Sequence, residues 1–371
     1  MFSDELKKWP WEATVERIYA KSEADVLRAL GRERRDVEDF MALISPAAAP
    51  YLETMARLSR RLTEERFGRT VSLFIPIYLS NACTNSCVYC GFHRENPTAR
   101  VTLTPEQMEQ EFASIKRLAP FESLLMVTGE HPARAGVEYL AEALRRAKAH
   151  FADLKIEVMP LAADEYARLA QCGLNGVVCF QETYNRERYN IYHPRGMKSR
   201  FEWRVDAPDR MGAAGLHSVG LGVLVGLEDW RADVAMMARH LRYLQRHYWR
   251  TRYSVNFPRM RPAANGGFQP NVVMNDRELA QLIFAMRIFE PTVDISLSTR
   301  ELPTLRDNLA TLGVTTMSAG SKTDPGGYGL FQQSLEQFSV SDERTPQEFF
   351  ARLRELGREP IWKDWDAVFD R

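Results

Sequence analysis

Three cysteines, Cys83, Cys87 and Cys90, lie close together in a C-x3-C-x2-C spacing. They follow an apolar run at residues 71–79. That run predicts a buried strand, so we expect the cysteines on a loop just beyond its carboxyl end. Three thiolates on one short loop can bind three irons of a [4Fe–4S] cluster, which usually takes four cysteines. The spacing therefore predicts a cluster whose fourth iron is open to a small molecule.

Two other chemistries are compatible with the same cysteines. His93 could complete a zinc site, because structural zinc is normally held by four ligands. C-x3-C-x2-C-x2-H is not a common zinc spacing, however, so the pattern favours the cluster. A cluster that takes its fourth ligand from another molecule would instead suit an iron–sulfur electron carrier or assembly protein without further chemistry.

The composition is that of a globular protein with a sizeable core. The 371 residues are 45% hydrophobic and 26% charged. The 49 acidic and 49 basic side chains cancel, so no overall charge attracts nucleic acid or an anionic membrane. No apolar stretch reaches the roughly 20 residues of a spanning helix, and the polar N-terminus is not a signal peptide. We expect neither a nucleic-acid nor a membrane partner.

The cysteine content indicates a reducing compartment. The chain has five cysteines, three of them in the loop, and Cys172 and Cys179 lie in apolar surroundings. A disulfide framework is therefore not expected. We expect a cytoplasmic protein, where an oxygen-sensitive cluster is also best protected.

Eight strand-like runs alternate with helical patterns after residue 70. The strands are expected near 71–79, 122–128, 155–160, 176–182, 218–226, 252–258, 293–299 and 314–319. One helix is expected to begin at a capping box, with Thr104 as N-cap and Gln107 three residues further on. Others are expected near 135–151, 163–172, 199–213, 230–248, 276–289 and 302–311. This order predicts an α/β fold, a (β/α)8 TIM barrel, with a partial barrel of six units as the alternative.

The regions before and after the barrel are expected to be helical. Residues 1–70 form an N-terminal helical extension covering one barrel end, with one helix from Ser22 to about Leu43 and another from near Ala49 to Phe67. The barrel itself is expected at 71–321. Residues 322–371 are expected to form a Gly- and Pro-rich loop and a helix near 345–357 that close the barrel, with an aromatic tail at 361–365.

Polar and glycine residues collect at the predicted carboxyl ends of the strands, where TIM barrels build their active sites. Gln181 and Glu182 end the fourth strand, and one of them should point inward because side chains alternate along a strand. That side chain could reach a ribose hydroxyl or an amine. Arg300 follows the seventh strand, and its planar guanidinium matches a carboxylate. Ser318 and Ser321, one strand over, could donate to the same oxygens.

These motifs resemble those of the radical S-adenosylmethionine (SAM) enzymes, in which the open iron binds SAM. The cysteine spacing is the family's, and Tyr89 is similar to its aromatic residue near the adenine. Thr128-Gly129-Glu130 resembles the Gly-Gly-Glu segment that binds the SAM amino group, with Thr in place of the first Gly. Gly222 and Gly226 lie in a segment similar to the family's glycine pattern near the adenine, where small residues allow close approach of a flat ring.

Five longer segments resemble those of the tyrosine lyases of thiamine thiazole biosynthesis: residues 81–92, 181–184, 220–231, 297–301 and 318–328. The resemblance covers roughly residues 70–330. The resemblance implies that L-tyrosine is cleaved at Cα–Cβ to p-cresol and 2-iminoacetate (dehydroglycine), with SAM converted to 5′-deoxyadenosine and methionine. Glu182 and Arg300 are the residues we expect to be catalytic. The expected partners are thiazole synthase, which would receive the imine, and flavodoxin or ferredoxin as electron donor.

Two related activities remain as alternatives. A hydrogenase-maturation tyrosine lyase carries a C-terminal extension with further cysteines, and no cysteine follows Cys179 here, so no second cluster is expected. A tryptophan lyase of the same superfamily would differ in the shape of the pocket for the aromatic ring, which the residues alone do not define.

Overall fold

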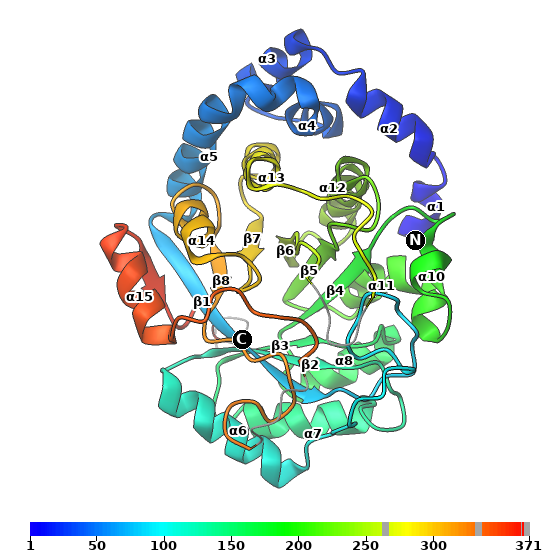
Figure 1. The fold of residues 1–371 in the computed structure, drawn as a ribbon, viewed down its shortest axis with the longest axis vertical. Coiled ribbons are helices and arrows are strands. Elements are labelled where there is room, and N and C mark those ends of the chain that lie inside the picture. Colours follow the sequence, from blue (N-terminus) through cyan, green and yellow to red (C-terminus); the bar gives the residue numbers. More distant parts are fainter. Residues whose placement is uncertain (262–266, 331–335, 365, 367–371) are drawn as a thin grey trace.

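Eight parallel strands close into a barrel in the computed structural model of the chain, which describes residues 1–261, 267–330, 336–364 and 366 (Figure 1). Each strand pairs with its neighbour in the sequence, and β8 returns to pair with β1. The strands are β1 Thr70–Ser80, β2 Ser123–Thr128, β3 Asp153–Glu157, β4 Gly176–Glu182, β5 Ser218–Val223, β6 Arg252–Asn256, β7 Asp294–Leu297 and β8 Thr316–Ser318. The (β/α)8 barrel is therefore confirmed, and the six-unit alternative is wrong.

Helices surround the strands as the alternating pattern predicts. They are α6 Pro105–Leu118, α7 Val137–Ala147, α8 Ala163–Gln171, α9 Tyr189–Tyr192, η2 Met197–Ser199, α10 Phe201–Val205, α11 Ala207–Ala213, α12 Trp230–His247, α13 Asp276–Phe289 and α14 Pro303–Ala310. The capping box of α6 is confirmed, because the Thr104 hydroxyl accepts from the Gln107 N–H at 3.3 Å. The single helix expected at 199–213 is instead two, since Pro208 lies in the first turn of α11 and has no N–H to continue a preceding helix.

The N-terminal helices differ from their prediction. They are α1 Phe2–Leu6, α2 Trp11–Tyr19, α3 Glu23–Gly31, α4 Val37–Ile44, η1 Pro46–Tyr51 and α5 Leu52–Phe67. The single helix expected from Ser22 to Leu43 is wrong, because Asp36 starts a new helix by accepting from the Asp39 N–H at 2.9 Å. The sequence predicted helical structure for residues 1–70 but did not delimit the first two helices.

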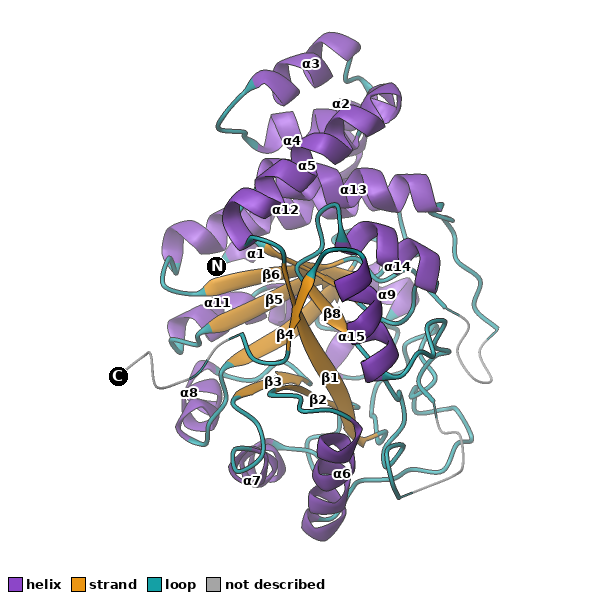
Figure 2. Cartoon of the chain, turned by 90° about the vertical axis from the view of Figure 1, so that its left-hand side faces the viewer, coloured by secondary structure: helices purple, strands orange, loops and turns teal. Residues whose placement is uncertain are grey.

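The sequence analysis expected these helices to cover a barrel end. They lie instead along the outside of α12 and α13 (Figures 1 and 2). Gln281 on α13 donates to the carbonyls of Leu43 and Ser45, both at 2.9 Å. Arg231 on α12 donates to the Ile44 carbonyl at 2.9 Å. The helical extension therefore stabilises the side of the barrel opposite α6 and α7 and leaves the strand ends to other segments.

The C-terminal segment reaches both ends of the barrel. After α15 (Pro346–Glu355), an unpredicted strand β9 (Glu359–Ile361) pairs in parallel with the start of β1. Trp362 then packs between Phe121 and Phe350, with ring centroids at 4.8 and 4.9 Å. Trp365, the last residue of the predicted aromatic tail, lies outside the described residues. The division into 1–70, 71–321 and 322–371 stays a prediction.

None of the described helices is both long and apolar enough to span a lipid bilayer.

Candidate active site

A cavity opens at the carboxyl ends of the strands and gathers most of the residues singled out in the sequence. Those in its wall are Cys83, Cys87, Tyr89, Cys90, Gly129, Glu130, Glu182, Arg300, Ser318 and Ser321. Gln181, Gly222 and Gly226 are not among its lining residues. The barrel thus brings ten predicted residues from five strand ends into one space.

The three cysteines lie on an irregular loop that follows β1 and faces this cavity. Cys87 is buried, and Cys83 and Cys90 are partly exposed toward the cavity. The Cys90 sulfur accepts from the Phe92 N–H at 3.4 Å and from the Gln337 amide at 3.5 Å. Burial raises the pKa of Cys83 to about 11. The thiol is therefore neutral until a metal displaces its proton, as metal binding to cysteine requires.

The cysteine arrangement fits a cluster better than zinc. Among the described residues, no three His, Cys, Asp or Glu side chains converge closely enough to hold one metal ion. His93, the fourth ligand of a zinc site, instead faces Glu95 at 3.4 Å. Tetrahedral zinc needs four donors converging on one point, whereas each cysteine of a cube binds its own iron. All three cysteines line one cavity, as the ligands of a cluster bound there would.

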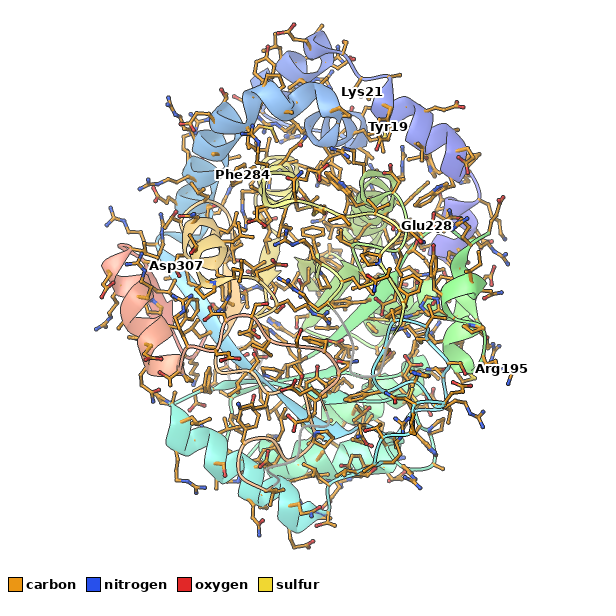
Figure 3. All side chains as sticks on the ribbon, viewed as in Figure 1. Tyr19, Lys21, Arg195, Glu228, Phe284 and Asp307 are labelled. Atoms are coloured by element: carbon orange, nitrogen blue, oxygen red, sulfur yellow. The ribbon has the colours of Figure 1, made fainter. Side chains whose placement is uncertain are left out.

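Two glycines allow the cysteine loop to lie where it does. A Cβ atom on Gly129 would lie 2.3 Å from the Ala82 carbonyl oxygen, so only glycine permits the end of β2 to pass beneath the loop. A Cβ on Gly196 would lie 2.1 Å from the Asn85 amide oxygen, and Gly196 also has φ of +92°. The neighbouring Arg195 carbonyl accepts from the Ser86 N–H at 3.2 Å, while the Arg195 side chain points outward at the edge of the molecule (Figure 3).

Glu130, beyond the end of β2, is held on two sides. Its carboxylate accepts from the Asn85 amide and from the Arg204 guanidinium, both at 2.7 Å. Burial favours the neutral acid, but Arg204 and Lys198 outweigh it and hold the pKa of Glu130 below its usual value. The group is therefore a permanent anion beside the cysteine loop, as a site for an ammonium group requires.

Glu182, not Gln181, faces the cavity. The pairing of β4 with β5 shifts register between Phe180 and Glu182, and Glu182 has φ of +71°, a conformation rare outside glycine. Its carboxylate accepts from the Lys198 ammonium at 2.6 Å. Neither side-chain amide atom of the buried Gln181 has a hydrogen-bond partner within the described ranges. The bulge aims the carboxylate into the site at the expense of a strained backbone.

Tyr89 is fixed by a chain of hydrogen bonds. Its hydroxyl lies 2.8 Å from Nε2 of His193, whose Nδ1 lies 2.9 Å from the Tyr189 carbonyl. Since a carbonyl only accepts, Nδ1 carries the proton and Nε2 accepts from Tyr89. Burial, together with Lys198 and Arg204, lowers the pKa of His193 well below its usual value, so the ring is neutral. Tyr89 is thus held at the cavity wall between the cysteines.

Arg300 is available for an anion. The possible partner Glu301 is occupied elsewhere, because Arg259 Nε lies 3.1 Å from both of its oxygens. No described carboxylate forms an ion pair with Arg300, whose guanidinium lies 3.3 Å from the centre of the Phe338 ring. Burial lowers the pKa of Arg300, but an arginine remains charged at neutral pH. A partly buried cation in a cavity wall with no ionic partner among the described residues is suited to receive the anion of a ligand.

The two serines differ in their contacts. The Ser318 hydroxyl accepts from the Thr299 N–H at 3.2 Å, which positions it beside the end of β7. The buried Ser321 hydroxyl has no hydrogen-bond partner in the described part of the chain. An unsatisfied hydroxyl in the wall of a cavity is a ready donor for a carboxylate ligand.

The two glycines outside the cavity wall have packing roles. A Cβ on Gly222 would lie 2.4 Å from the Phe180 ring. Gly226 has φ of +129°, and a Cβ there would lie 3.1 Å from Cβ atoms of Met260 and Pro270. Contact of Gln181, Gly222 or Gly226 with SAM stays a prediction.

The cavity also contains residues that the sequence analysis did not select. Among them are Tyr78, Asn85, Glu157, Lys198, Arg204, Gln337 and Phe338. Glu157 is the last residue of β3 and lies within the strand predicted at 155–160, so it could have been chosen on that ground. Lys198 and Arg204 come from the irregular region after β4. Gln337 and Phe338 come from the C-terminal segment, where Gln337 also accepts from the Tyr78 hydroxyl at 2.9 Å. Nothing in the local sequence around Lys198, Arg204, Gln337 or Phe338 predicts that these residues reach the site.

Comparisons with known proteins agree with this geometry. Residues 77–241 match the Radical SAM superfamily, and residues 256–359 match the Biotin and Thiamin Synthesis associated domain. The barrel is thus that of a radical SAM enzyme, a class that uses a [4Fe–4S] cluster and SAM.

Two curated relatives are similar along their whole length. The 2-iminoacetate synthase of Escherichia coli (strain K12) is 47% identical over 100% of this chain and 98% of the relative. That of Salmonella typhimurium is 46% identical over the same shares. The chain belongs to the 2-iminoacetate synthase family.

A solved structure shares the architecture. The FeFe-hydrogenase maturase HydG from Carboxydothermus hydrogenoformans superposes with a TM-score of 0.91 at 30% identity, over 98% of this chain and 86% of that one.

Proposed function

We propose that this chain cleaves the Cα–Cβ bond of L-tyrosine to give p-cresol and 2-iminoacetate, for the thiazole of thiamine. The observation that carries the proposal is the end-to-end similarity to proteins named 2-iminoacetate synthase. The cavity supports it, because the three-cysteine loop, the ionised Glu130 and Arg300, which has no ionic partner among the described residues, lie together there.

The cysteine loop and its surroundings serve the cofactors. Cys83, Cys87 and Cys90 would hold three irons of the cluster and leave its fourth iron for SAM. When bound, the cluster and SAM supply reductive cleavage of SAM and the hydrogen-abstracting radical that this yields. Glu130, kept ionised by Arg204, accepts from the SAM amino group. Tyr89, in the same cavity wall, would contact the adenine of SAM.

The opposite wall serves the amino acid. Arg300 binds its carboxylate through two parallel hydrogen bonds, and Ser318 and Ser321 donate to the same oxygens. Glu182, on the bulge of β4, lies near the amino nitrogen and orients it for hydrogen removal. The Lys198 ammonium, 2.6 Å from the Glu182 carboxylate, holds that carboxylate in position beside the nitrogen. Fragmentation of the substrate then leaves the imine, and the ring fragment takes up one electron and one proton.

The chemistry implies partners and a compartment. 2-Iminoacetate hydrolyses in water, so direct transfer to thiazole synthase is favoured. Flavodoxin or ferredoxin supplies the electron. All five cysteines are free thiols, and we propose that the protein works in the cytoplasm, where they stay reduced.

An anaerobic assay tests the proposed function. Reconstituted protein with SAM, a reductant and tyrosine should release p-cresol and 5′-deoxyadenosine, and Cys83→Ala should release neither. Parallel reactions with tryptophan, scored for indole products, distinguish the two lyase classes. If the reaction with tyrosine forms 5′-deoxyadenosine but no p-cresol, the proposal that the chain cleaves tyrosine is wrong.

A further inference from the structure

The floor of the site cavity also forms the roof of a second cavity deeper in the barrel. Five residues line both spaces: Phe74, Leu125, Glu157, Phe180 and Asn256. They come from β1, β2, β3, β4 and β6, and each is only half-buried although it points into the barrel. This partition, which we call the cavity floor, is therefore a surface that faces empty space within the protein.

Part of the floor is apolar and aromatic. Phe180 extends into the barrel because Gly222 on the neighbouring strand has no side chain in its way; a Cβ there would lie 2.4 Å from the ring. Phe74 lies on the floor with it, and Leu125 completes the apolar surface. Flat aromatic groups favour the edge and face contacts that two such rings offer.

The rest of the floor is polar and without partners. Within the described ranges, neither the Glu157 carboxylate nor the Asn256 amide forms a hydrogen bond or an ion pair. The other two carboxylates of the cavity differ, since Glu130 is paired with Arg204 and Glu182 with Lys198. Polar groups at this depth normally have partners, so an unpartnered carboxyl and amide beside aromatic rings indicate a ligand with one polar atom on an apolar ring.

We propose that the cavity floor recognises the phenol ring of the substrate, with Glu157 accepting a hydrogen bond from its hydroxyl. The inference rests on the proposed function, which supplies tyrosine as the substrate. Arg300 and Ser321 lie beyond the ends of β7 and β8 and hold the carboxylate, so the side chain extends from them down into the barrel. Phe74 and Phe180 flank the ring, and Asn256 lies within the same polar patch.

The environment of Glu157 fits a hydroxyl better than an ammonium group. Burial and then Glu182 raise the pKa of Glu157 to about 7, while Arg300 acts in the opposite direction. A carboxyl that is ionised only part of the time is a poor counter-ion for an amine, whereas it can hydrogen-bond a hydroxyl in either form. A site built to bond a substrate hydroxyl also rejects analogues that lack it, by up to about 10⁵-fold.

Binding without turnover tests this assignment. The reconstituted protein with SAM and no reductant is dialysed against labelled L-tyrosine or L-phenylalanine. The wild type should prefer tyrosine, and Glu157→Leu should weaken tyrosine roughly 10- to 100-fold while changing phenylalanine less than about threefold. Glu157→Gln, which keeps an acceptor, should retain part of the preference. Glu111→Gln, which alters a buried carboxyl outside the cavity, is the matched control and should retain all of it.

The outcomes separate the possibilities. If Glu157→Leu weakens the binding of tyrosine and phenylalanine equally, Glu157 acts at the amino group. If neither affinity changes, Glu157 has no part in recognition. Either result overturns the inference. If that variant does not fold, the wild type is tested with O-methyltyrosine, whose ring oxygen carries no hydrogen to donate. The wild type should bind O-methyltyrosine as weakly as phenylalanine, and binding as tight as that of tyrosine overturns the inference. p-Cresol formation by the same wild-type preparation tests the proposed function separately.

Discussion

Arg204 donates to Glu130 at 2.7 Å across the inside of the barrel mouth, and both side chains are at most 10% exposed. The pair joins the segment after β4 to the end of β2, directly beneath the cysteine loop. It explains how a carboxylate buried beside three thiols stays ionised and thus able to receive an ammonium group.

Removing the cation should therefore damage both stability and SAM binding. Arg204→Leu leaves the buried Glu130 carboxylate without its ionic partner and with only the Asn85 amide as a donor. We expect this to cost about 3–5 kcal/mol in the free energy of unfolding. Denaturant unfolding and equilibrium dialysis of SAM measure the two effects. The double variant Arg204→Leu, Glu130→Gln should recover much of the stability but not the SAM affinity. If Arg204→Leu binds SAM as the wild type does, the ammonium role of Glu130 is wrong.

Glu182 should couple SAM cleavage to tyrosine cleavage. Glu182→Gln keeps the shape of the side chain and removes its charge, so Lys198 loses its ionic partner and the substrate amine loses an acceptor. We expect p-cresol formation to fall roughly 100-fold or more, as for loss of a proton-transfer group, while 5′-deoxyadenosine continues to form. Chromatography of both products gives the ratio. A proportional fall in both would show that Glu182 serves SAM instead.

Gly222 distinguishes packing from cofactor contact. Gly222→Ala places a Cβ atom 2.4 Å from a carbon of the Phe180 ring, which must then move. Overpacking of this kind lowers the free energy of unfolding by about 1–3 kcal/mol. Because Phe180 lies on the cavity floor, the affinity for tyrosine should fall and the affinity for SAM should not. A fall in SAM affinity with unchanged tyrosine binding would instead support the adenine contact expected from the sequence.

His240 should make the fold sensitive to acid. Its ring is buried, stacked on Phe2 at 3.9 Å, with Nδ1 2.9 Å from the Tyr184 hydroxyl. Burial lowers the pKa of His240 from 6.5 to about 3. Between these values the unfolded chain binds the proton and the folded chain does not. Stability from this group is therefore complete above pH 6.5 and falls as the pH falls, by about 1.4 kcal/mol per pH unit.

The comparison with His240→Gln measures this contribution. Thermal unfolding between pH 6.5 and 5 avoids the range in which ordinary carboxyls titrate. The wild-type melting temperature should fall more steeply over this interval than that of the variant. Parallel curves would show that the buried imidazole does not supply the acid sensitivity.

The barrel and much of its mouth could be predicted from the sequence, for a clear physical reason. Parallel strands read as apolar runs, and their carboxyl ends meet at one mouth, so Glu130, Arg300 and Ser318 could be brought together without coordinates. The choice between Gln181 and Glu182 could not be made, because it depends on a bulge and on φ of +71° that regular alternation does not foresee.

The other unpredicted features depend on contacts between distant segments. Lys198 and Arg204 reach the site from a region of short helices, and Phe338 reaches Arg300 from a segment beyond the last barrel strand. No local sequence pattern predicts contacts of this kind between distant segments. The N-terminal helices were misplaced for the same reason, since their partners Arg231 and Gln281 lie on helices far along the chain.

The most direct test of the central claim follows the carbon atoms of the substrate. Tyrosine labelled in the ring with one isotope and at Cα with another is turned over anaerobically with SAM and reductant. Cleavage of Cα–Cβ predicts ring label only in p-cresol and Cα label only in 2-iminoacetate and its hydrolysis product, glyoxylate, with one 5′-deoxyadenosine for each p-cresol. Both labels in a single product, or ring label that never separates from Cα, would contradict the account.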